Sequence, residues 1–220
     1  MPLQQLPNWI QSSVFLLAFN AGMLNVMGLI TVLHQSISHM TGNVSLFAMA
    51  LFTFDLDHLY YVASITLCFV LGSFYSGLIL GNSEVKLGRR YGVPLTLVSI
   101  FIFLCWLFLP AFPRYALLWA AAAMGLQNAM VSHYKGTIIR TTHLSGVLTD
   151  IGLALGYWAR GLKLNLRRLI LHILILIGFL LGGIVATILY HYLHLNAFLV
   201  PSIITGLMSI AYWFLYLKQS

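Results

Sequence analysis

The sequence predicts an all-α polytopic membrane protein, an inverted repeat of two halves that each hold three transmembrane helices and one re-entrant or broken helix. Three observations predict this class. Hydrophobic residues make up 60% of the 220 residues and charged residues only 7%, whereas soluble domains carry roughly a quarter charged residues. The second half of the chain repeats the first. Two of the apolar segments are too short to cross a membrane. We expect one membrane domain over residues 1–220.

The composition excludes several classes of function. The net charge of +7 comes from basic residues in short loops, with no basic face that would bind nucleic acid. Cys68 and Cys105 lie inside apolar runs and show no metal-ligand spacing. The four acidic residues form no nucleophile–base pair, and no nucleotide-binding motif is present. We therefore expect no enzyme activity, no cofactor, no metal and no nucleic-acid partner.

Four pairs of matching segments indicate an internal duplication, which we place at residues 9–110 and 115–217. The matches occur in the same order and at nearly constant spacing, and they include Asn, His, Pro and Trp positions. Asn25 corresponds to Asn128, and His39 corresponds to His143. The matched segments are 21–27 with 124–130, 39–42 with 143–146, 69–73 with 179–183, and 93–94 with 200–201.

Eight apolar segments follow one another along the chain. They are 9–33, 42–54, 58–80, 93–110, 115–132, 144–159, 169–192 and 197–217. Six are long enough to span the membrane. Segments 42–54 and 144–159 would reach only roughly 20–24 Å as helices, short of the roughly 30 Å hydrocarbon core. We expect both to enter to mid-depth and return as half-helices. The alternative is that they cross, as the second halves of broken helices.

The charges favour six crossings over eight. If the loop at residues 86–90 is cytoplasmic, eight crossings divide the basic residues five to six between the two sides. Six crossings place ten of the eleven inside, and leave Arg114 outside with Asp55 and Asp57. The positive-inside rule selects the second arrangement, with both termini cytoplasmic. Three crossings per half invert the second copy, so the two half-helices meet near the midplane.

The turns before the half-helices carry the first candidate binding residues, Thr41, Gly42, Asn43, Ser145 and Gly146. We expect Thr41 and Ser145 to be N-caps, and the glycines to permit backbone geometries closed to other residues. A half-helix that begins there points its free N–H groups and positive dipole end at the midplane, where they could bind an anion. The alternative is that these are ordinary caps or helix contacts.

Four further side chains could act at the same place. His39 and His143 could donate to a solute or relay protons, or they could be packing histidines at a helix junction. Arg140 and Asp150 have no charged counterpart in the first half. They could pair with each other, or Arg140 could hold a carboxylate- or phosphate-like group. Arg140 could instead extend to the cytoplasmic surface.

Polar and small residues inside the apolar segments predict support for these turns. Asn25 and Asn128 could bond the hairpin backbone of their own repeat or line a cavity, and Gln127 adds polarity in the second copy only. Small residues spaced four apart predict close helix packing, either within one protomer or between protomers. A homo-oligomer is therefore one of the possible assemblies. These pairs are Gly72 with Ser76, Ser73 with Gly77, and Gly178 with Gly182.

Three segments, at residues 39–43, 125–129 and 140–146, resemble the signature segments of the YoaK-like family. Its members are small bacterial membrane proteins grouped as a domain of unknown function. The resemblance covers most of the chain and implies a multi-pass protein of the bacterial inner membrane. Family members often carry a Gly-x-x-Asp-Ala-like sequence where this chain has Gly22 to Val26, with Asn25 in place of the acid.

These features predict a secondary transporter or channel for a small anionic or polar solute, bound near the midplane between the two hairpins. Its partners would be that solute and the lipid bilayer. The alternative is a membrane scaffold or assembly partner that transports nothing. A scaffold needs no polar residues at mid-depth, whereas the two predicted hairpins would place several there.

Overall fold

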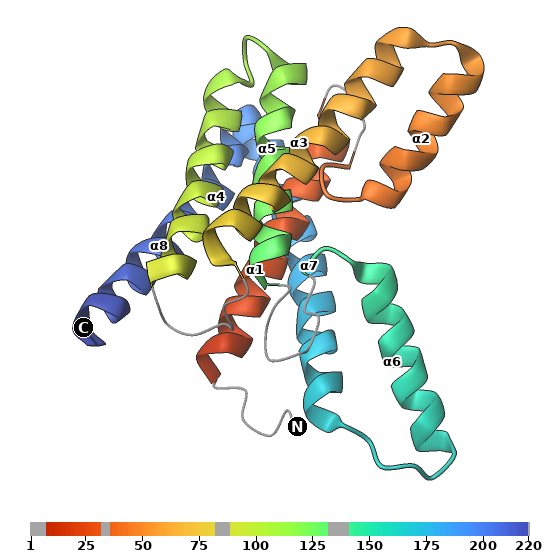
Figure 1. The fold of residues 1–220 in the computed structure, drawn as a ribbon, viewed down its shortest axis with the longest axis vertical. Helices are drawn as coiled ribbons and strands as arrows, with labels where there is room; N and C mark the ends of the chain where they lie inside the picture. The colour runs from red at the N-terminus through yellow and green to blue at the C-terminus, as the bar shows by residue number, and fades with distance from the viewer. Residues whose placement is uncertain (1–7, 32–35, 82–88, 132–140, 220) are drawn as a thin grey trace.

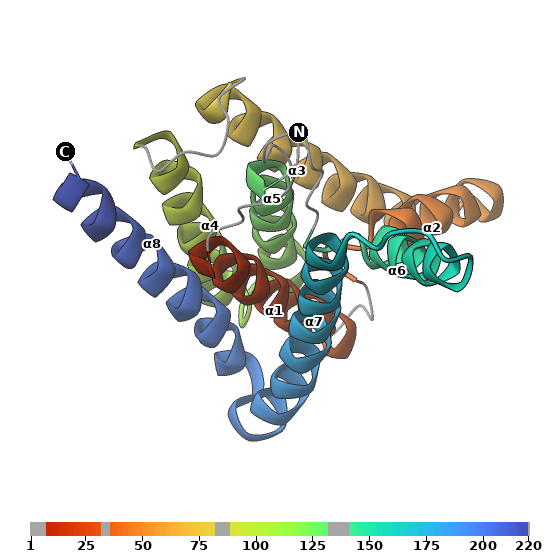
Figure 2. The ribbon, with the colours of Figure 1, turned by 90° about the horizontal axis from the view of Figure 1, so that it is seen from below.

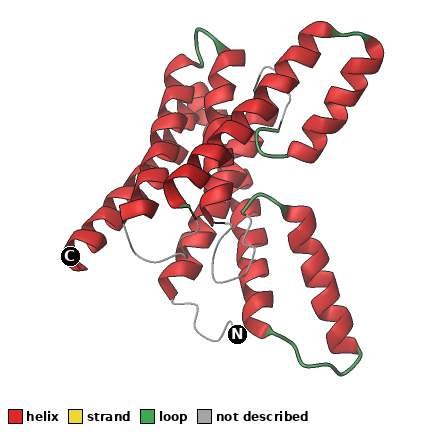
Figure 3. Cartoon of the chain, in the orientation of Figure 1, coloured by secondary structure: helices red, strands yellow, loops and turns green. Residues whose placement is uncertain are grey.

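The computed structural model describes residues 8–31, 36–81, 89–131 and 141–219. These residues form helices and connecting turns, with no strand among them (Figures 1 and 3). The helices are α1 (Asn8–Ile30), α2 (Met40–Thr53), α3 (Leu56–Leu80), α4 (Arg89–Phe108), α5 (Pro113–Val131), α6 (Leu144–Ala159), α7 (Leu166–Leu193), the short 3₁₀ helix η1 (His194–Phe198) and α8 (Leu199–Gln219). Each apolar segment of the sequence corresponds to one α-helix.

Long apolar helices give the chain the character of a helical membrane protein. Among the described residues four stretches are long and apolar enough to cross, namely Gln11–Ile30, Leu56–Leu80, Tyr91–Phe108, and Leu166–Lys218, which covers α7, η1 and α8. Large apolar side chains face outward, such as Leu180 and Phe214, which are 60% and 68% exposed. Such exposure suits a lipid environment rather than water.

Helix α5 does not reach the same hydropathy, because its second half carries Gln127 and Asn128. It lies at the centre of the bundle, with α1, α3 and α4 around it (Figure 2). Ala120, Ala121, Ala123 and Met124 in its middle are fully buried, whereas Tyr115 in its first turn is 69% exposed. Protein therefore surrounds the second half of this helix, and its polar side chains can find partners inside the fold.

Two close helix crossings set the core, α1 against α7 and α3 against α5. A Cβ atom at Gly22 would lie 2.1 Å from the carbonyl oxygen of Phe179, and one at Gly125 would lie 1.9 Å from that of Phe69. The reciprocal contacts are Gly182 with the Phe19 oxygen at 1.9 Å and Gly72 with the Ala122 oxygen at 2.0 Å. Only glycine fits at these four positions, because backbone meets backbone.

The predicted small-residue packing is thus confirmed for Gly72, Gly178 and Gly182, and it acts within one chain. Gly77 makes no such contact within the chain, since a Cβ there would meet nothing within 4 Å, and for Gly77 packing between protomers stays a prediction. Ser73 also contributes, since its hydroxyl donates to the Gly125 carbonyl at 3.0 Å across the α3–α5 crossing.

Hydroxyl groups join α4 to α8. The Ser99 hydroxyl donates to the Ser202 carbonyl at 2.9 Å, and the Ser202 hydroxyl donates to the Ser99 carbonyl at 3.1 Å. Thr96 and Ser209 share a further hydrogen bond of 2.7 Å. Such bonds between helices satisfy polar groups that lipid cannot. Helices α4 and α8 are therefore bonded directly to each other.

The short helices α2 and α6 form two arms. The α2–α3 arm turns at Phe54, whose φ of 53° is left-handed, and Asp55 then caps α3 by accepting from the His58 N–H at 3.1 Å. In the α6–α7 arm, Asn165 caps α7 by accepting from the Arg168 N–H at 3.2 Å. Both short helices begin in the middle of the molecule and run outward to opposite ends (Figure 1).

The described charges divide between those two ends. The loop from α6 to α7, with Arg160 and Lys163, lies in the lower half of Figure 1, as do the first turn of α1 and the last turn of α8. At the opposite end Arg114 pairs with Asp57 at 2.7 Å, joining the first turns of α5 and α3. Arg160 and Lys163 therefore lie at one end of the molecule, and the Arg114–Asp57 pair lies at the other.

Candidate functional site

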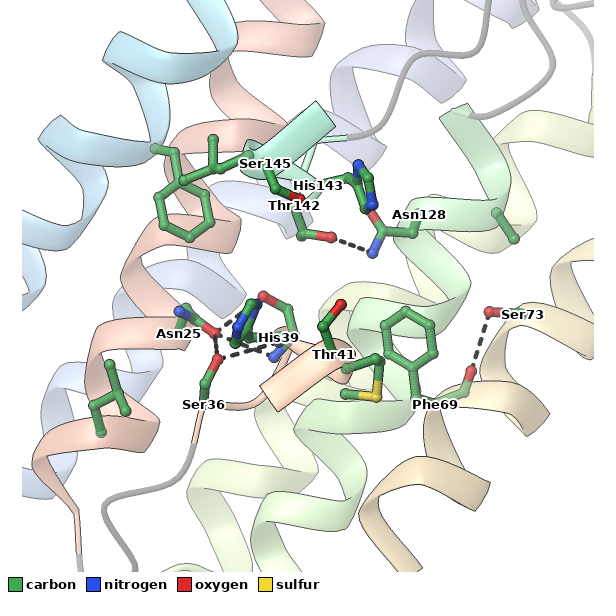
Figure 4. Close-up of a pocket in the computed structure, with 16 residues that line it drawn as sticks. Asn25, Ser36, His39, Thr41, Phe69, Ser73, Asn128, Thr142, His143 and Ser145 are labelled. Atoms are coloured by element: carbon green, nitrogen blue, oxygen red, sulfur yellow. Dashed lines mark hydrogen bonds between the residues drawn. The ribbon is translucent and has the colours of Figure 1, made fainter. Parts of the chain in front are cut away.

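A cavity of about 690 Å³ lies where the two arms begin. Side chains from α1, α3, α5 and α7 line it, together with the first residues of α2 and α6 (Figure 4). Most of the lining comes in pairs from positions that correspond in the two predicted repeats. These pairs are Asn25 with Asn128, Ser38 with Thr142, His39 with His143, Met40 with Leu144, Thr41 with Ser145, and Phe69 with Phe179.

The first turns of α2 and α6 present backbone donors at this cavity. His39 is the N-cap of α2 and His143 is the N-cap of α6, and neither side chain makes a capping hydrogen bond. The first helical bonds run from Asn43 N–H to the His39 carbonyl at 3.2 Å and from Val147 N–H to the His143 carbonyl at 3.1 Å. The N–H groups of the three residues before Asn43, and of the three before Val147, have no acceptor within their own helix. We call such a helix end open.

The prediction that Thr41 and Ser145 are the N-caps is wrong. Each is the second residue of its helix, directly after Met40 or Leu144. The backbones of His39 and His143 are not helical, with φ near −90° and ψ of 72° and 65°, and the helices begin at the next residue. The Thr41 and Ser145 side chains line the cavity instead of capping the helix, and Figure 4 shows them facing each other across it.

The backbone argument for Gly42 and Gly146 is also wrong. Both are ordinary helical residues; the described glycines with positive φ are Gly81 and Gly161. Their lack of a side chain is what matters. A Cβ at Gly42 would lie 2.6 Å from a ring carbon of His39, and one at Gly146 would lie 2.4 Å from Nδ1 of His143. Each glycine makes room for an imidazole that folds back over the first turn of its helix.

Asn25 holds the segment that leads into α2. Its Oδ1 accepts hydrogen bonds from the Ser36 hydroxyl, from the Ser38 N–H at 3.2 Å and from the Ser38 hydroxyl at 3.0 Å. The Ser36 hydroxyl also accepts from the His39 N–H at 3.1 Å. The amide is therefore both an anchor for the approach to the helix end and part of the cavity lining.

Asn128 does the same for α6. Its amide nitrogen donates to the Thr142 hydroxyl at 2.5 Å, and its Oδ1 accepts from the Thr141 hydroxyl at 3.3 Å. Gln127 lies deeper and outside the lining, where it donates to the Leu17 carbonyl at 3.0 Å and to the Thr141 hydroxyl at 3.3 Å. The scaffold role and the cavity role, which the sequence left as alternatives, coincide in the two asparagines.

Two further predicted residues, Asn43 and Asp150, lie away from the cavity. Asn43 is buried and donates to the Ser36 carbonyl at 3.3 Å, so it supports the approach segment and is not part of the lining. Asp150 lies on α6, where Arg168 of α7 donates to its Oδ2 at 3.0 Å. Arg140 lies outside the described residues, so its pairing with Asp150 stays a prediction.

The aromatic and hydroxyl pairs of the lining were not predicted as binding residues. Phe69 and Phe179 begin one pair of matched segments, and Ser38 and Thr142 directly precede another. Their correspondence in the two halves is the signal that could have found them. Within the part of the chain that the structure describes, no group of three His, Cys, Asp or Glu side chains could hold a metal ion.

Comparison with known proteins places the chain in a family but gives no activity. No curated protein matches it, and no solved structure matches it. Residues 13–211 match the family model described as "Protein of unknown function (DUF1275)". This match covers most of the chain, including every residue that lines the cavity. The chain belongs to the DUF1275 family.

Proposed function

We propose that this protein is a secondary transporter or channel, and that a small anionic or polar solute binds in the cavity between α2 and α6. One observation carries the proposal. Two helix ends without side-chain caps, one from each half, begin at the same cavity. A backbone N–H left unsatisfied at membrane depth costs several kcal/mol. Water or a solute that accepts hydrogen bonds must therefore occupy this cavity.

The inverted repeat over residues 9–110 and 115–217 is part of the proposal. The first helix of each half crosses the third helix of the other half at a glycine, Gly22 against Phe179 and Gly125 against Phe69. The two arms run to opposite ends of the molecule (Figure 1). Repeats of this kind commonly give a transporter two alternative access routes to one central site.

The orientation follows from charge and from the YoaK-like resemblance. We place the end with Arg160 and Lys163 in the cytoplasm, together with both termini, because basic loops are retained inside. The end with Asp57 and Arg114 is then external. The resemblance supports the bacterial inner membrane as the location.

Electrostatics favours an anion over a cation. Each helix end carries roughly half a positive charge. At about 4 Å and an effective dielectric constant of about 20, two such ends stabilise a unit anion by about 4 kcal/mol and disfavour a cation by a similar amount. None of the described residues that line the cavity is Asp or Glu. Arg140 would add a full positive charge if it extends toward the site.

The polar cavity also bears on the scaffold alternative. A cavity of this size lowers the stability of the fold, and so does the burial of polar groups such as Asn25 and Asn128 around it. A scaffold needs neither feature. Bonding between helices would be simpler without the cavity, as the Ser99–Ser202 contact between α4 and α8 illustrates. A solute that binds between the two helix ends would account for both the cavity and the polar residues around it.

The test places an acid at the helix end. In His39→Asp and His143→Asp the new carboxylate would accept hydrogen bonds from the open N–H groups, and its charge would cancel the positive charge of the helix end. Such a cap typically stabilises the helix itself by about 1 kcal/mol, so the variants should fold. His39→Asn caps the helix without charge. Asn165→Asp adds the same charge at the N-cap of α7, outside the cavity.

Flux into proteoliposomes is the measurement, with nitrate and formate as anions and potassium and choline as cations. Wild type should pass the anions selectively. Each Asp variant in the cavity should lower anion flux at least roughly tenfold, since it removes about 2 kcal/mol of attraction. Asn165→Asp should not, and Arg140→Gln should reduce the flux. Cation selectivity in wild type, or full anion flux in both Asp variants, would overturn the proposal.

A further inference from the structure

The α6–α7 arm carries a cluster of ionisable side chains between the cavity and the basic end of the molecule. The Asp150 carboxylate accepts from Arg168 Nη2 at 3.0 Å and lies 3.3 Å from His172 Nε2. The His172 side chain is only 9% exposed, and that of Asp150 is 34% exposed. Asp150 is six residues beyond Leu144, which places it about 9 Å along α6 from the cavity.

The equivalent arm of the first half manages without such a cluster. At the repeat spacing, Leu46 stands where Asp150 stands and Val62 stands where His172 stands. Val62 is fully buried in the apolar packing of α3. Holding a short helix against its long partner therefore requires neither an acid nor a histidine. An ionisable pair at this depth is costly, so it points to a function rather than to packing.

Few other groups could titrate beside His172. Asp150 faces it from α6, and Arg168 accompanies it on α7. Helix α1, which packs against the same part of the arm, contributes Val14 and Ala18, and neither can bind a proton. Lys135 and Arg140 lie outside the described residues.

We propose that Asp150 and His172 form a proton-binding site, and that the proton is the coupling ion of the transport proposed above. Before proton uptake we take the imidazole as neutral, with its Nε2 3.3 Å from the Asp150 carboxylate, which Arg168 neutralises. A second proton, taken up from the cytoplasmic side by the free ring nitrogen, leaves the cluster with one net positive charge. The coupling rests on the proposed function, whereas the proton site does not.

Uptake of the proton changes the contact between α6 and α7. The added charge lies on His172 of α7 and strengthens its attraction to Asp150 of α6, so protonation shifts α6 relative to α7 at this contact. The first turn of α6 carries His143 and Ser145 at the cavity. A shift of α6 along α7 therefore changes the solute site directly. The α2–α3 arm, which lacks the cluster, stays in place.

Spin-label distances in lipid nanodiscs test this, after Cys68 and Cys105 are replaced by Ala. One pair of labels goes on exposed positions of the α6–α7 arm, Leu155 and Ile177. The control pair goes on the positions equivalent by repeat in the α2–α3 arm, Leu51 and Leu67, which are also exposed. Distances are measured at about pH 5 and about pH 8, which bracket the usual titration of histidine.

The first pair should change its mean separation by about 2 Å between the two pH values, a typical helix shift. The control pair should not change. His172→Gln and Asp150→Asn should each abolish the change, with His172→Gln retaining a hydrogen-bond donor. The proposed proton site would be refuted if the α6–α7 distance in wild type did not change with pH. It would also be refuted if the distance still changed with pH in His172→Gln. A pH response in a protein that passes no anions would refute the transport proposal alone.

Discussion

The α3–α5 crossing allows a quantitative test of the fold through Gly125→Ala. The new Cβ would lie 1.9 Å from the Phe69 carbonyl oxygen and 2.7 Å from its carbon. A close carbon–oxygen contact is about 3.3 Å, so the two helices must separate by more than about 1 Å. They cannot relieve the overlap by rotating a side chain, because both partners are backbone. The separation also weakens the 3.0 Å bond from Ser73 to the Gly125 carbonyl.

Overpacking of this kind costs about 1–3 kcal/mol and sometimes more. Alanine recovers up to about 1 kcal/mol through its better helix propensity. Because backbone meets backbone, we expect the upper part of the range, with a net loss of about 2 kcal/mol. At roughly 2–4 °C per kcal/mol for a chain of this size, the unfolding midpoint should fall by roughly 4–8 °C.

The assay is thermal unfolding of purified protein in detergent, with Gly77→Ala as the matched control on α3. A Cβ at Gly77 meets nothing within 4 Å, so that variant should gain about 0.5–1 kcal/mol. Gly182→Ala should reproduce the loss at the α1–α7 crossing, where its Cβ would lie 1.9 Å from the Phe19 oxygen. Equal midpoints for Gly125→Ala and Gly77→Ala would refute the close crossing.

Three further predictions concern the cavity and the topology. Gly42→Val and Gly146→Val should each displace the imidazole over the helix end and abolish anion flux in liposomes while leaving membrane insertion intact; normal flux in both would remove the helix ends from the mechanism. Asn25→Ala removes the acceptor of three hydrogen bonds, so it should cost about 1–3 kcal/mol in thermal unfolding; an unchanged midpoint would contradict its anchoring role. A single cysteine at Lys163 should react with an impermeant reagent only from the cytoplasmic side, and labelling from outside would exclude the six-crossing arrangement.

The sequence was sufficient for the helices because their apolar runs have definite lengths. Segments 42–54 and 144–159 were expected to be short, and α2 and α6 are the short helices of the structure. The pairs His39 with His143 and Thr41 with Ser145 were expected to meet, and all four line one cavity. The duplication made this possible, since it related residues about a hundred positions apart before any contact was known.

Other features depend on contacts that a linear pattern does not contain. The helix start at Met40 rather than after Thr41 follows from the backbone angles of His39, which residue type alone does not set. The role of Gly42 depends on where the His39 ring turns. Asp150 contacts Arg168 and His172 of α7, which lie 18 and 22 residues later and which no spacing in the sequence indicated. The predicted repeat implied that the two hairpins meet, but not that each half packs its first helix against the third of the other.

Anomalous scattering from crystals grown with bromide would test the central claim most directly, which is that two open helix ends form one anion site. The account predicts a bromide peak in the cavity between Thr41 and Ser145, within about 3.5 Å of backbone N–H groups of both helices, a distance that allows for the larger radius of bromide. The peak should disappear in His39→Asp. A cavity without bromide at saturating concentration, or one that binds rubidium instead, would contradict the account.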